Sequence, residues 1–429
     1  MKDPTVPDWS AKLARTGWWH TMELPGETIE GVRSLADMRH TLEHFPVPAD
    51  LTGKRVLDIG AWDGWFTFEV ERRGAEVTAV DCWDNPRFRY ARQRLDSKAE
   101  YVVADVYELS PERLGRFDLV LFFGVLYHLK HPLLAVERVC ALAEDAVFVE
   151  SWVTGGKPGQ RPSMEFYETG ELGGQVDNWT GPNTACLLAF CRTAGFARVE
   201  LRGVANGRAH VACYRRWEPP VASPVAAPEL LKTAHNTDGG LNFSSRRDDY
   251  VSCWFRTDAE RLSREDVRPE VAGYGSLPLR VGRKEAGVWQ ANFKLPPGLP
   301  PGWHEVRLRA GSSGYSNTIP IAVDLPAETD ALEITGLADG ASWTPGLLSG
   351  NVLSLWVAGL PDNADFRNVR VLAGGRELAV EYLSPAEGPG PRQINARFPE
   401  PLPPGDYDVA VSVGATQSPP MRCRVADFR

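Results

Sequence analysis

The sequence predicts an α/β domain with a mostly parallel sheet, followed by two all-β sandwiches. Up to residue 217, short apolar runs alternate with helix-like stretches, an order that favours parallel strands joined by crossover helices. After residue 229 the apolar runs alternate every second residue and are separated by proline and glycine turns, which favours sandwiches. Residues 218–229 contain four prolines and are expected to form the linker between the two regions.

The elements of the first region follow from its apolar patterns. Residues 65–74 and 132–143 have helical spacing. Five apolar runs are expected to be buried strands: residues 55–61, 75–81, 99–105, 117–123 and 145–151. In the second region, "LPPGWHEVRLRAG" at 299–311 is repeated as "LPPGDYDVAVSVG" at 402–414. This repeat predicts two similar sandwiches of about 100 residues each, the size of an immunoglobulin-like module.

Composition and charge narrow the class of protein. The 429 residues are 43% apolar and 24% charged, with no run of about 18 apolar residues that could span a bilayer. The first residues lack the basic start and apolar stretch of an export signal, so a cytoplasmic location is expected. The net charge of -9 argues against a nucleic-acid partner, because nucleic-acid binders usually carry a basic face. Seven scattered cysteines without a Cys-x-x-Cys pair predict reduced thiols and no metal site.

The stretch "VLDIGAWDGWFTFEV" at 56–70 suggests a ligand site. A strand ends at Asp58 and continues through Gly60 and Gly64 into a helix, so small residues stand where backbone can approach a ligand, although they would also permit a tight turn. Asp81 and Asp105 end the next two strands. Because ligands of open α/β sheets bind at that edge, Asp81 is expected to accept hydrogen bonds from ribose hydroxyls. The alternative is three solvated strand-end carboxylates.

These motifs, with "VTAVD", "VVADVYEL" and "FDLVLFFGVLYHLKHP", resemble those of class I S-adenosylmethionine-dependent methyltransferases. The resemblance covers residues 15–216 and implies a Rossmann-like, mostly parallel seven-stranded sheet. The "GVLYH" element at 124–128 resembles the branch of the bacterial tRNA wobble-uridine carboxymethyltransferase. A nicotinamide dehydrogenase would instead show G-x-G-x-x-G, which is absent at this turn.

The resemblance implies a set of residues around S-adenosylmethionine. The residues expected to bind it are Asp58, Gly60, Trp62, Gly64, Asp81, Asp105, Val106 and Gly124. Trp62 departs from the family pattern, because it stands where the middle glycine of the loop is usual. Its ring is expected to turn away and pack. The implied domains are a largely helical lid (1–50), the methyltransferase domain (51–217), the linker (218–229) and the sandwiches (230–326 and 327–429).

Four residues are candidates for the chemistry of transfer. His128, after the fourth strand, is the first candidate for a general base, and His20 in the lid is the second; each has a structural role as its alternative. Glu150 ends the fifth strand and is expected to face the acceptor or a neighbouring hydroxyl. Tyr127 matches the family tyrosine beside the transferred group.

The acceptor is expected to be a small organic molecule such as a sugar or a natural-product intermediate, methylated on oxygen or nitrogen, or on carbon. The residues expected to line its pocket are Trp19, Tyr167, Asn178, Trp179 and Arg208. Carboxymethyl transfer is disfavoured, because "WWHTMELPG" has no lysine to pair with a carboxylate. RNA remains the alternative acceptor, through the basic stretch at residues 87–98.

The sandwiches show no catalytic constellation. They are expected to position substrate or to build a homodimer beside the catalytic mouth, and a non-catalytic interaction protein is the rival of another class. Five tryptophans are expected to be core or intersheet residues rather than sugar platforms: Trp254, Trp289, Trp303, Trp343 and Trp356.

Overall fold

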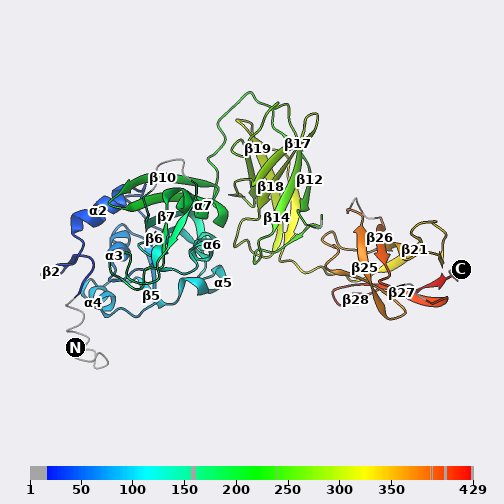
Figure 1. Cartoon of the computed structure of the whole chain (residues 1–429), viewed down its shortest axis with the longest axis horizontal. Coiled ribbons are helices and arrows are strands. Elements are labelled where there is room, and N and C mark those ends of the chain that lie inside the picture. Colours follow the sequence, from blue (N-terminus) through cyan, green and yellow to red (C-terminus); the bar gives the residue numbers. More distant parts are fainter. Residues whose placement is uncertain are drawn as a thin grey trace. The chain divides into compact units, whose positions relative to one another are not determined.

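The computed structural model describes residues 17–155, 161–237, 239–386, 388, 390–400 and 403–426. The chain forms two compact units (Figure 1). The first unit contains Met1–Ser223, Ser263–Pro278 and Pro296–Leu299, and the second contains Pro224–Leu262, Leu279–Leu295 and Pro300–Arg429. The division into lid, catalytic domain and two sandwiches stays a prediction, and residues 1–16 of the expected lid lie outside the described residues.

A seven-stranded sheet organises the described part of the first unit, in the order β10-β11-β7-β6-β3-β4-β5. Its strands are β3 (Arg55–Ile59), β4 (Glu76–Asp81), β5 (Glu100–Val103), β6 (Phe117–Phe123), β7 (Ala143–Trp152), β10 (Arg198–Ala205) and β11 (Arg208–Tyr214). The first five strands and β10 run parallel to one another, and β11, which pairs with β7 and with β10, runs antiparallel to them. The chain leaves β3 toward β4 and returns on the other side through β6. The carboxyl ends of β3 and β6 therefore form the switch point where such sheets bind ligands.

Helices and turns cover this sheet. They are α3 (Trp65–Arg72), α4 (Pro86–Arg94), η1 (Val106–Glu108), α5 (Pro111–Leu114), η2 (Leu126–His128), α6 (Pro132–Leu142) and α7 (Thr184–Ala194). Two apolar cores result, one including residues of α6 and α7 and the other residues of α3 and α4. Two hairpins complete the unit: β8 (Met164–Phe166) with β9 (Thr180–Pro182), and β15 (Val267–Val271) with β16 (Tyr274–Gly275).

The N-terminal segment differs from the expected helical lid. Its described part begins with a hairpin of β1 (Met22–Leu24) and β2 (Glu27–Ile29), and only α2 (Leu35–Glu43) is α-helical. Gly26, at a φ of 81°, allows the tight turn of the hairpin. Ser34 and Asp37 form a capping box that starts α2. The expectation of a largely helical segment is therefore wrong for the residues that the structure describes.

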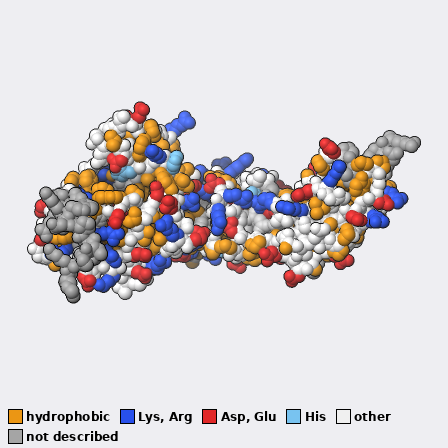
Figure 2. Space-filling model, turned by 90° about the horizontal axis from the view of Figure 1, so that it is seen from below, with side chains coloured by type: hydrophobic (Ala, Val, Ile, Leu, Met, Phe, Trp, Pro, Cys, Tyr) orange, Lys and Arg blue, Asp and Glu red, His pale blue; other side chains and the backbone are white. Residues whose placement is uncertain are grey.

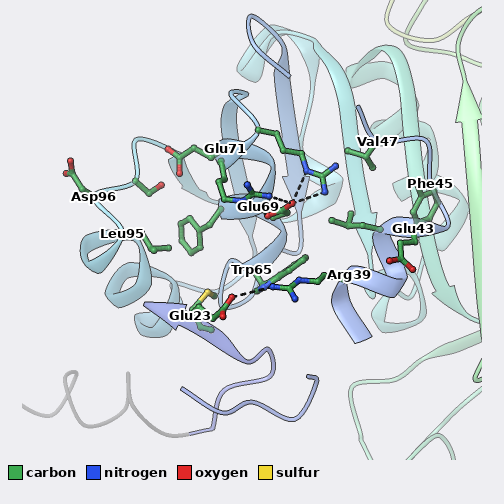
Figure 3. A pocket seen from close by; sticks show the side chains of 16 residues that line it. Glu23, Arg39, Glu43, Phe45, Val47, Trp65, Glu69, Glu71, Leu95 and Asp96 are labelled. Carbon is green, nitrogen blue, oxygen red and sulfur yellow. Dashed lines mark hydrogen bonds and ion pairs between the residues drawn. The ribbon is translucent and has the colours of Figure 1, made fainter. Parts of the chain in front are cut away.

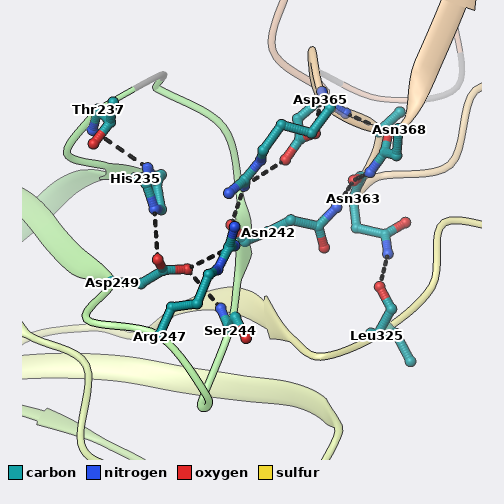
Figure 4. A network of polar contacts seen from close by, with 12 residues as sticks. His235, Thr237, Asn242, Ser244, Arg247, Asp249, Leu325, Asn363, Asp365 and Asn368 are labelled. Atoms are coloured by element: carbon teal, nitrogen blue, oxygen red, sulfur yellow. Dashed lines mark hydrogen bonds and ion pairs between the residues drawn. The ribbon is translucent and has the colours of Figure 1, made fainter.

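The second unit is all-β in its described residues. A four-stranded sheet has the order β12-β14-β18-β17, and β13, β20 and β19 pair in that order. These strands are β12 (Glu229–His235), β13 (Asn242–Phe243), β14 (Tyr250–Arg256), β17 (Arg280–Glu285), β18 (Val288–Lys294), β19 (Gly302–Ala310) and β20 (Ile319–Val323). Figure 4 shows a polar network at Asn242, whose side chain donates to the Asn363 carbonyl and whose own carbonyl accepts from Arg367.

The rest of the second unit is a nine-stranded sheet, with β28 added to β27 of the path β21-β23-β26-β25-β24-β27-β29-β22. Its strands are β21 (Glu333–Asp339), β22 (Leu347–Leu348), β23 (Val352–Ala358), β24 (Val369–Ala373), β25 (Arg376–Leu383), β26 (Arg392–Arg397), β27 (Gly405–Val413), β28 (Thr416–Gln417) and β29 (Met421–Val425). Alternate residues such as Leu353, Leu355 and Val357 are fully buried in its core. The immunoglobulin-like assignment stays a prediction.

The tryptophans of the second unit correct one expectation. Trp289 is 6% exposed and belongs to the core. Trp303 and Trp343 are 45% and 53% exposed, and Trp254 and Trp356 are partly exposed. Trp254 and Trp356 hold outward positions on strands whose alternate residues are buried, which explains why they stay out of the core.

The remaining features of the described residues concern membrane-spanning helices, charged surface patches and metal-binding clusters. No described helix is long and apolar enough to cross a membrane. On the face drawn in Figure 2, acidic and basic side chains are interspersed. The seven cysteines are free, and the described residues contain no cluster of three or more His, Cys, Asp or Glu side chains that could hold a metal ion.

Candidate functional site

The loop between β3 and α3 is set by two glycines. Gly60 and Gly64 have φ angles of 77° and 95°, where other residues are strained. A Cβ on Gly60 would lie 2.1 Å from Val125 Cγ2, and one on Gly64 would lie 2.5 Å from Phe68 Cε2. Both glycines are therefore required by the turn and its packing, whatever the loop binds.

Trp62 takes the left-handed conformation that a glycine would adopt without cost, with φ at 52°. Its backbone N–H donates to Asp81 Oδ2 at 2.9 Å. Its ring centroid lies 5.8 Å from that of Trp83, and the side chain stays 40% exposed. The ring thus packs against Trp83, just after the end of β4, and the loop keeps its contact with Asp81.

The three aspartates differ in setting. Asp81 is 6% exposed, accepts N–H bonds from Trp62 (2.9 Å) and Trp83 (3.2 Å), and has its pKa raised, chiefly by burial. Asp58 is 2% exposed and accepts the Thr67 hydroxyl at 2.6 Å; burial raises the pKa of Asp58 to about 6. By contrast, Asp105 is exposed and caps η1, next to the buried Val106. The Asp58 carboxylate is thus committed to Thr67 of α3, whereas Asp81 and Asp105 stand at strand ends.

Sequence reasoning missed Asp63, which fixes the N-terminal segment onto this loop. Asp63 is fully buried and accepts the backbone N–H groups of Trp19 (2.8 Å) and His20 (2.9 Å) on Oδ2. Its Oδ1 pairs with His20 Nδ1, and His20 is 6% exposed. The candidate base His20 and the candidate pocket residue Trp19 are therefore held directly beside the cofactor loop.

A second polar cluster lies at the carboxyl ends of β6 and β7. Arg208 Nη1 lies 3.0 Å from both oxygens of Glu150, which is 1% exposed, and Arg208 Nη2 donates to the Tyr127 hydroxyl at 3.1 Å. Burial raises the pKa of Tyr127 more than Arg208 lowers it. The Gly124 N–H donates to the Glu150 carbonyl at 3.0 Å. The expected catalytic residues Tyr127 and Glu150 thus meet the expected substrate residue Arg208.

Arg33 of the N-terminal segment joins this cluster, and sequence reasoning missed it too. The charges of Glu150 and Arg208 both act on its guanidinium, whose pKa burial lowers. Arg33 Nη2 donates to Thr41 Oγ1 at 2.8 Å, which anchors it to α2. The charges of two arginines, Arg33 and Arg208, thus act close to Tyr127, together with that of Glu150.

The β8–β9 hairpin and the segment before β9 contact the same cluster. The Trp179 N–H donates to the Tyr127 carbonyl at 2.8 Å, and the Tyr167 N–H donates to the Trp179 carbonyl at 2.9 Å. His128 Nδ1 lies 3.2 Å from the Asp177 carbonyl, and burial lowers the pKa of His128. Asn178 is 3% exposed, and its Oδ1 has no hydrogen-bond partner in the described part of the chain.

A cavity of about 830 Å³ lies elsewhere in the first unit (Figure 3). Residues of β1, α2, α3 and the end of α4 line it, and none of the site residues expected from the sequence is among them. Two of its acidic groups bind arginines: Glu23 lies 3.5 Å from Arg39, as Figure 3 shows, and Glu69 binds Arg72 and Arg73. This cavity is therefore separate from the two clusters described above.

Comparisons with known proteins agree with the motifs. Over 96 residues the chain is 35% identical to a ubiquinone biosynthesis O-methyltransferase of Nitrosococcus oceani, covering 21% of this chain and 39% of that protein. Over 166 residues it is 30% identical to a tRNA U34 carboxymethyltransferase of Azotobacter vinelandii, covering 36% and 49%. The chain thus spans less than half the length of these relatives.

A solved structure and a family model add to this comparison. The N-terminal domain of EvdMO1, solved in the presence of SAH and D-fucose, is 22% identical with a TM-score of 0.38, covering 48% of this chain and 93% of that chain. Residues 32–155 match the family model described as a methyltransferase domain, which confirms for this part of the chain the resemblance carried by its sequence motifs.

Proposed function

We propose that the first unit is an S-adenosylmethionine-dependent methyltransferase acting on an oxygen or nitrogen atom of a small organic acceptor. The observation that carries the proposal is Asp81, a buried carboxylate at the end of β4 whose two oxygens are oriented by the N–H groups of Trp62 and Trp83. It stands in the expected position for the ribose hydroxyls of a cofactor bound at the switch point of the sheet.

The residues present fit such a cofactor. Asp81 offers acceptors to a diol, Val106 and Asp105 follow β5 where an adenine is expected, and the Gly60–Gly64 loop borders the methionine part. When bound, the sulfonium supplies an electrophilic methyl group for in-line displacement. The protein then has to align the acceptor and to exclude water from the site.

The candidate bases differ in what supports them. With a proton on Nδ1 shared with the Asp177 carbonyl, the His128 Nε2 keeps a lone pair, and the lowered pKa of His128 keeps the ring neutral near pH 7. That combination suits a group that takes a proton from the acceptor. Glu150 is committed to Arg208, so we assign it the role of positioning that arginine rather than of a base.

A small acceptor is favoured over RNA, because several basic side chains of residues 87–98 already pair with carboxylates. Arg89 pairs with Asp84 (2.5 Å), Arg94 with Glu27 (2.7 Å) and Lys98 with Asp96 (2.9 Å). Arginines already paired with carboxylates have less to gain from phosphates. The unpartnered Asn178 Oδ1 instead offers a single acceptor to an N–H or O–H group of a small molecule.

Calorimetric titration of the full chain with S-adenosylhomocysteine tests this proposal. Asp81→Ala removes two hydrogen bonds to a charged acceptor, so the affinity is expected to fall about 100-fold. The matched control is Asp118→Ala, because Asp118 begins β6 at the opposite edge and binds Lys54. Equal affinities for the wild type and Asp81→Ala, or no binding by the wild type, would contradict the proposal.

Transfer of a carboxymethyl group is the second candidate, and Arg33 favours it. A carboxylate beside the sulfonium needs a cationic partner, and Arg33 and Arg208 provide two near Tyr127 although the segment has no lysine. If this candidate holds, Arg33→Met lowers the affinity for carboxy-S-adenosylmethionine at least tenfold while that for S-adenosylmethionine stays within twofold. If Arg33→Met changed the affinity for both compounds equally, carboxymethyl transfer would lose its support and ordinary methyl transfer would remain.

A further inference from the structure

One outward sheet face of the second unit carries an ordered set of aromatic and amide side chains. On β23 and β26, Trp356 is paired across the strands with Gln393, and Ser354 with Asn395. Asn395 is also paired with Tyr382 of β25. Cross-strand partners share a side of the sheet, so these five side chains lie on one face, opposite the buried core. We call this set, with Trp343, the Trp356 face.

The amides of the Trp356 face are fixed in orientation. Ser354 Oγ and Gln393 Nε2 both donate to Asn395 Oδ1, each at 2.9 Å. The Asn395 Nδ2 group therefore points away from these donors, and among the described residues no acceptor binds it. An oriented amide donor is thus left available on a surface that also presents aromatic rings.

Trp343 adds a second ring at a cost in backbone energy. Its φ of 60° is left-handed, a conformation that is strained for a residue with a side chain. The side chain is 53% exposed, and its ring centroid lies 5.9 Å from that of Trp356 at an interplanar angle of 45°. A strained backbone that presents a large apolar ring to water points to a ligand.

The same pattern of Ser, Trp, Gln and Asn side chains recurs on β14 and β18. We call this second set the closed face, because its amide donor is already bonded. Ser252 Oγ (3.1 Å) and Gln290 Nε2 (2.9 Å) meet at Asn292 Oδ1, as their counterparts do at Asn395. There, however, Asn292 Nδ2 donates to Asn236 at 3.0 Å, and Lys232 Nζ lies 5.6 Å from the Trp254 ring centroid. The chain therefore contains a matched pair of faces, one with its donor occupied and one with its donor available.

We propose that the Trp356 face binds a neutral oligosaccharide. A pyranose ring presents an apolar C–H face, which packs on an aromatic ring, and hydroxyl groups, which bond to amides. The face itself is uncharged, and Arg397, the next outward residue of β26, is paired with Glu381. The charges thus fit a neutral ligand rather than an acidic or a basic one. This site is independent of the transfer reaction proposed for the first unit.

Saturation-transfer NMR of the full chain tests the proposal, with cellohexaose, maltohexaose, xylohexaose and chitohexaose as probes. At least one of them is expected to bind the wild type at millimolar or lower concentration. Trp343→Ala is expected to weaken that binding at least tenfold, and Asn395→Ala at least threefold. Both side chains reach the surface, and a circular-dichroism spectrum identical to that of the wild type checks that each variant is folded.

The matched control is Trp254→Ala on the closed face, which is expected to leave binding unchanged. The proposal would be overturned if none of the four hexasaccharides bound the wild type. It would also be overturned if binding survived unchanged in folded Trp343→Ala and Asn395→Ala. A loss with Trp254→Ala equal to that with Trp343→Ala would also overturn it, because the site would then not be the Trp356 face.

Discussion

Polar groups at the two ends of the parallel strands of the seven-stranded sheet differ in burial and in pairing. We call these ends the amino edge, where the strands begin, and the carboxyl edge, where they finish. At the amino edge, Lys54 pairs with Asp118 at 2.9 Å, and the Tyr274 hydroxyl donates to Glu144 at 2.6 Å while it accepts from Arg116 at 2.8 Å. Lys54 is exposed to water, and Asp118 and Glu144 are partly exposed. At the carboxyl edge, acids such as Asp58 and Asp81 are buried, and burial raises their pKa values.

This difference separates groups that serve the fold from groups held for chemistry. An acid buried with a raised pKa destabilises the folded state at neutral pH, whereas an exposed ion pair contributes little either way. Perturbed acids at a ligand-binding edge are therefore candidates for function, in contrast to the paired groups of the opposite edge.

The largest expected contrast between the edges is in stability. Arg208→Ala removes both hydrogen bonds to the buried Glu150 carboxylate and leaves only the charge of Arg33 to offset it, which is expected to cost about 3–5 kcal/mol. At the amino edge, Arg116→Ala is expected to cost about 1 kcal/mol or less, because Glu144 is partly exposed and keeps its bond to Arg216. Urea-induced unfolding of the full chain measures both free energies.

A double variant separates charge from packing in that experiment. Glu150→Gln combined with Arg208→Ala removes the buried charge, so it is expected to be more stable than Arg208→Ala alone. Equal losses for Arg116→Ala and Arg208→Ala would remove the distinction between the two edges.

A smaller contrast concerns the sign of pH dependence. The folded state keeps a proton on Asp58 up to about pH 6, whereas an unfolded aspartate loses it near pH 4, so Asp58 lowers stability as the pH rises through this window. Relative to Asp58→Asn, the wild type is expected to lose about 2 kcal/mol between pH 4 and pH 7. Urea unfolding at a series of pH values measures this difference.

Asp118 at the amino edge is expected to show the opposite sign. Burial alone would raise its pKa, but Lys54 and the Arg55 N–H hold it below the usual value. Its contribution to stability is present above the unfolded pKa and is lost as the pH falls through the folded one. Relative to Asp118→Asn, the wild type should therefore lose stability only in acid. The same sign at both edges would contradict the electrostatic comparison.

The sequence was enough to predict the positions of those site residues that stand at the ends of strands. Asp81, Tyr127 and Glu150 could be placed at the carboxyl edge because parallel strands bring their ends together. The partners of these groups could not be placed. Asp63 meets His20 across 43 residues, and Arg33, which is anchored to Thr41 of α2, is close enough for the charge of Glu150 to act on it. Both arrangements depend on packing that no local pattern encodes.

Sequence patterns did not predict two features of the fold: a hairpin whose strands are very short, and a repeat made of polar side chains. The β1–β2 hairpin has strands of three residues, too few for a period to appear. The repeat of Pro-Pro-Gly segments indicated two modules, whereas the repeat of Ser-x-Trp with Gln-x-Asn became apparent only from the strand register. Periodicity showed that Trp254 and Trp356 lie in strands, but not which side of the sheet they occupy.

The smallest expected effect concerns Trp62, the residue that gives the carboxyl edge its backbone strain. Trp62→Gly relieves a left-handed φ worth about 1–2 kcal/mol but adds about 0.5–1 kcal/mol of unfolded-state entropy, so a gain of at most about 1.5 kcal/mol is expected. Because the ring lies beside Trp83 near Asp81, the affinity for S-adenosylhomocysteine should fall several-fold. Thermal unfolding and calorimetry measure the two changes.

Asp96→Gly provides the matched control, because Asp96 also has a left-handed φ, 49°, but follows α4 away from the carboxyl edge. It relieves the same kind of strain and should leave the affinity for S-adenosylhomocysteine unchanged. If Trp62→Gly also left that affinity unchanged, the strain at Trp62 would have no connection with the ligand, and this loop would resemble the amino edge in serving the fold alone.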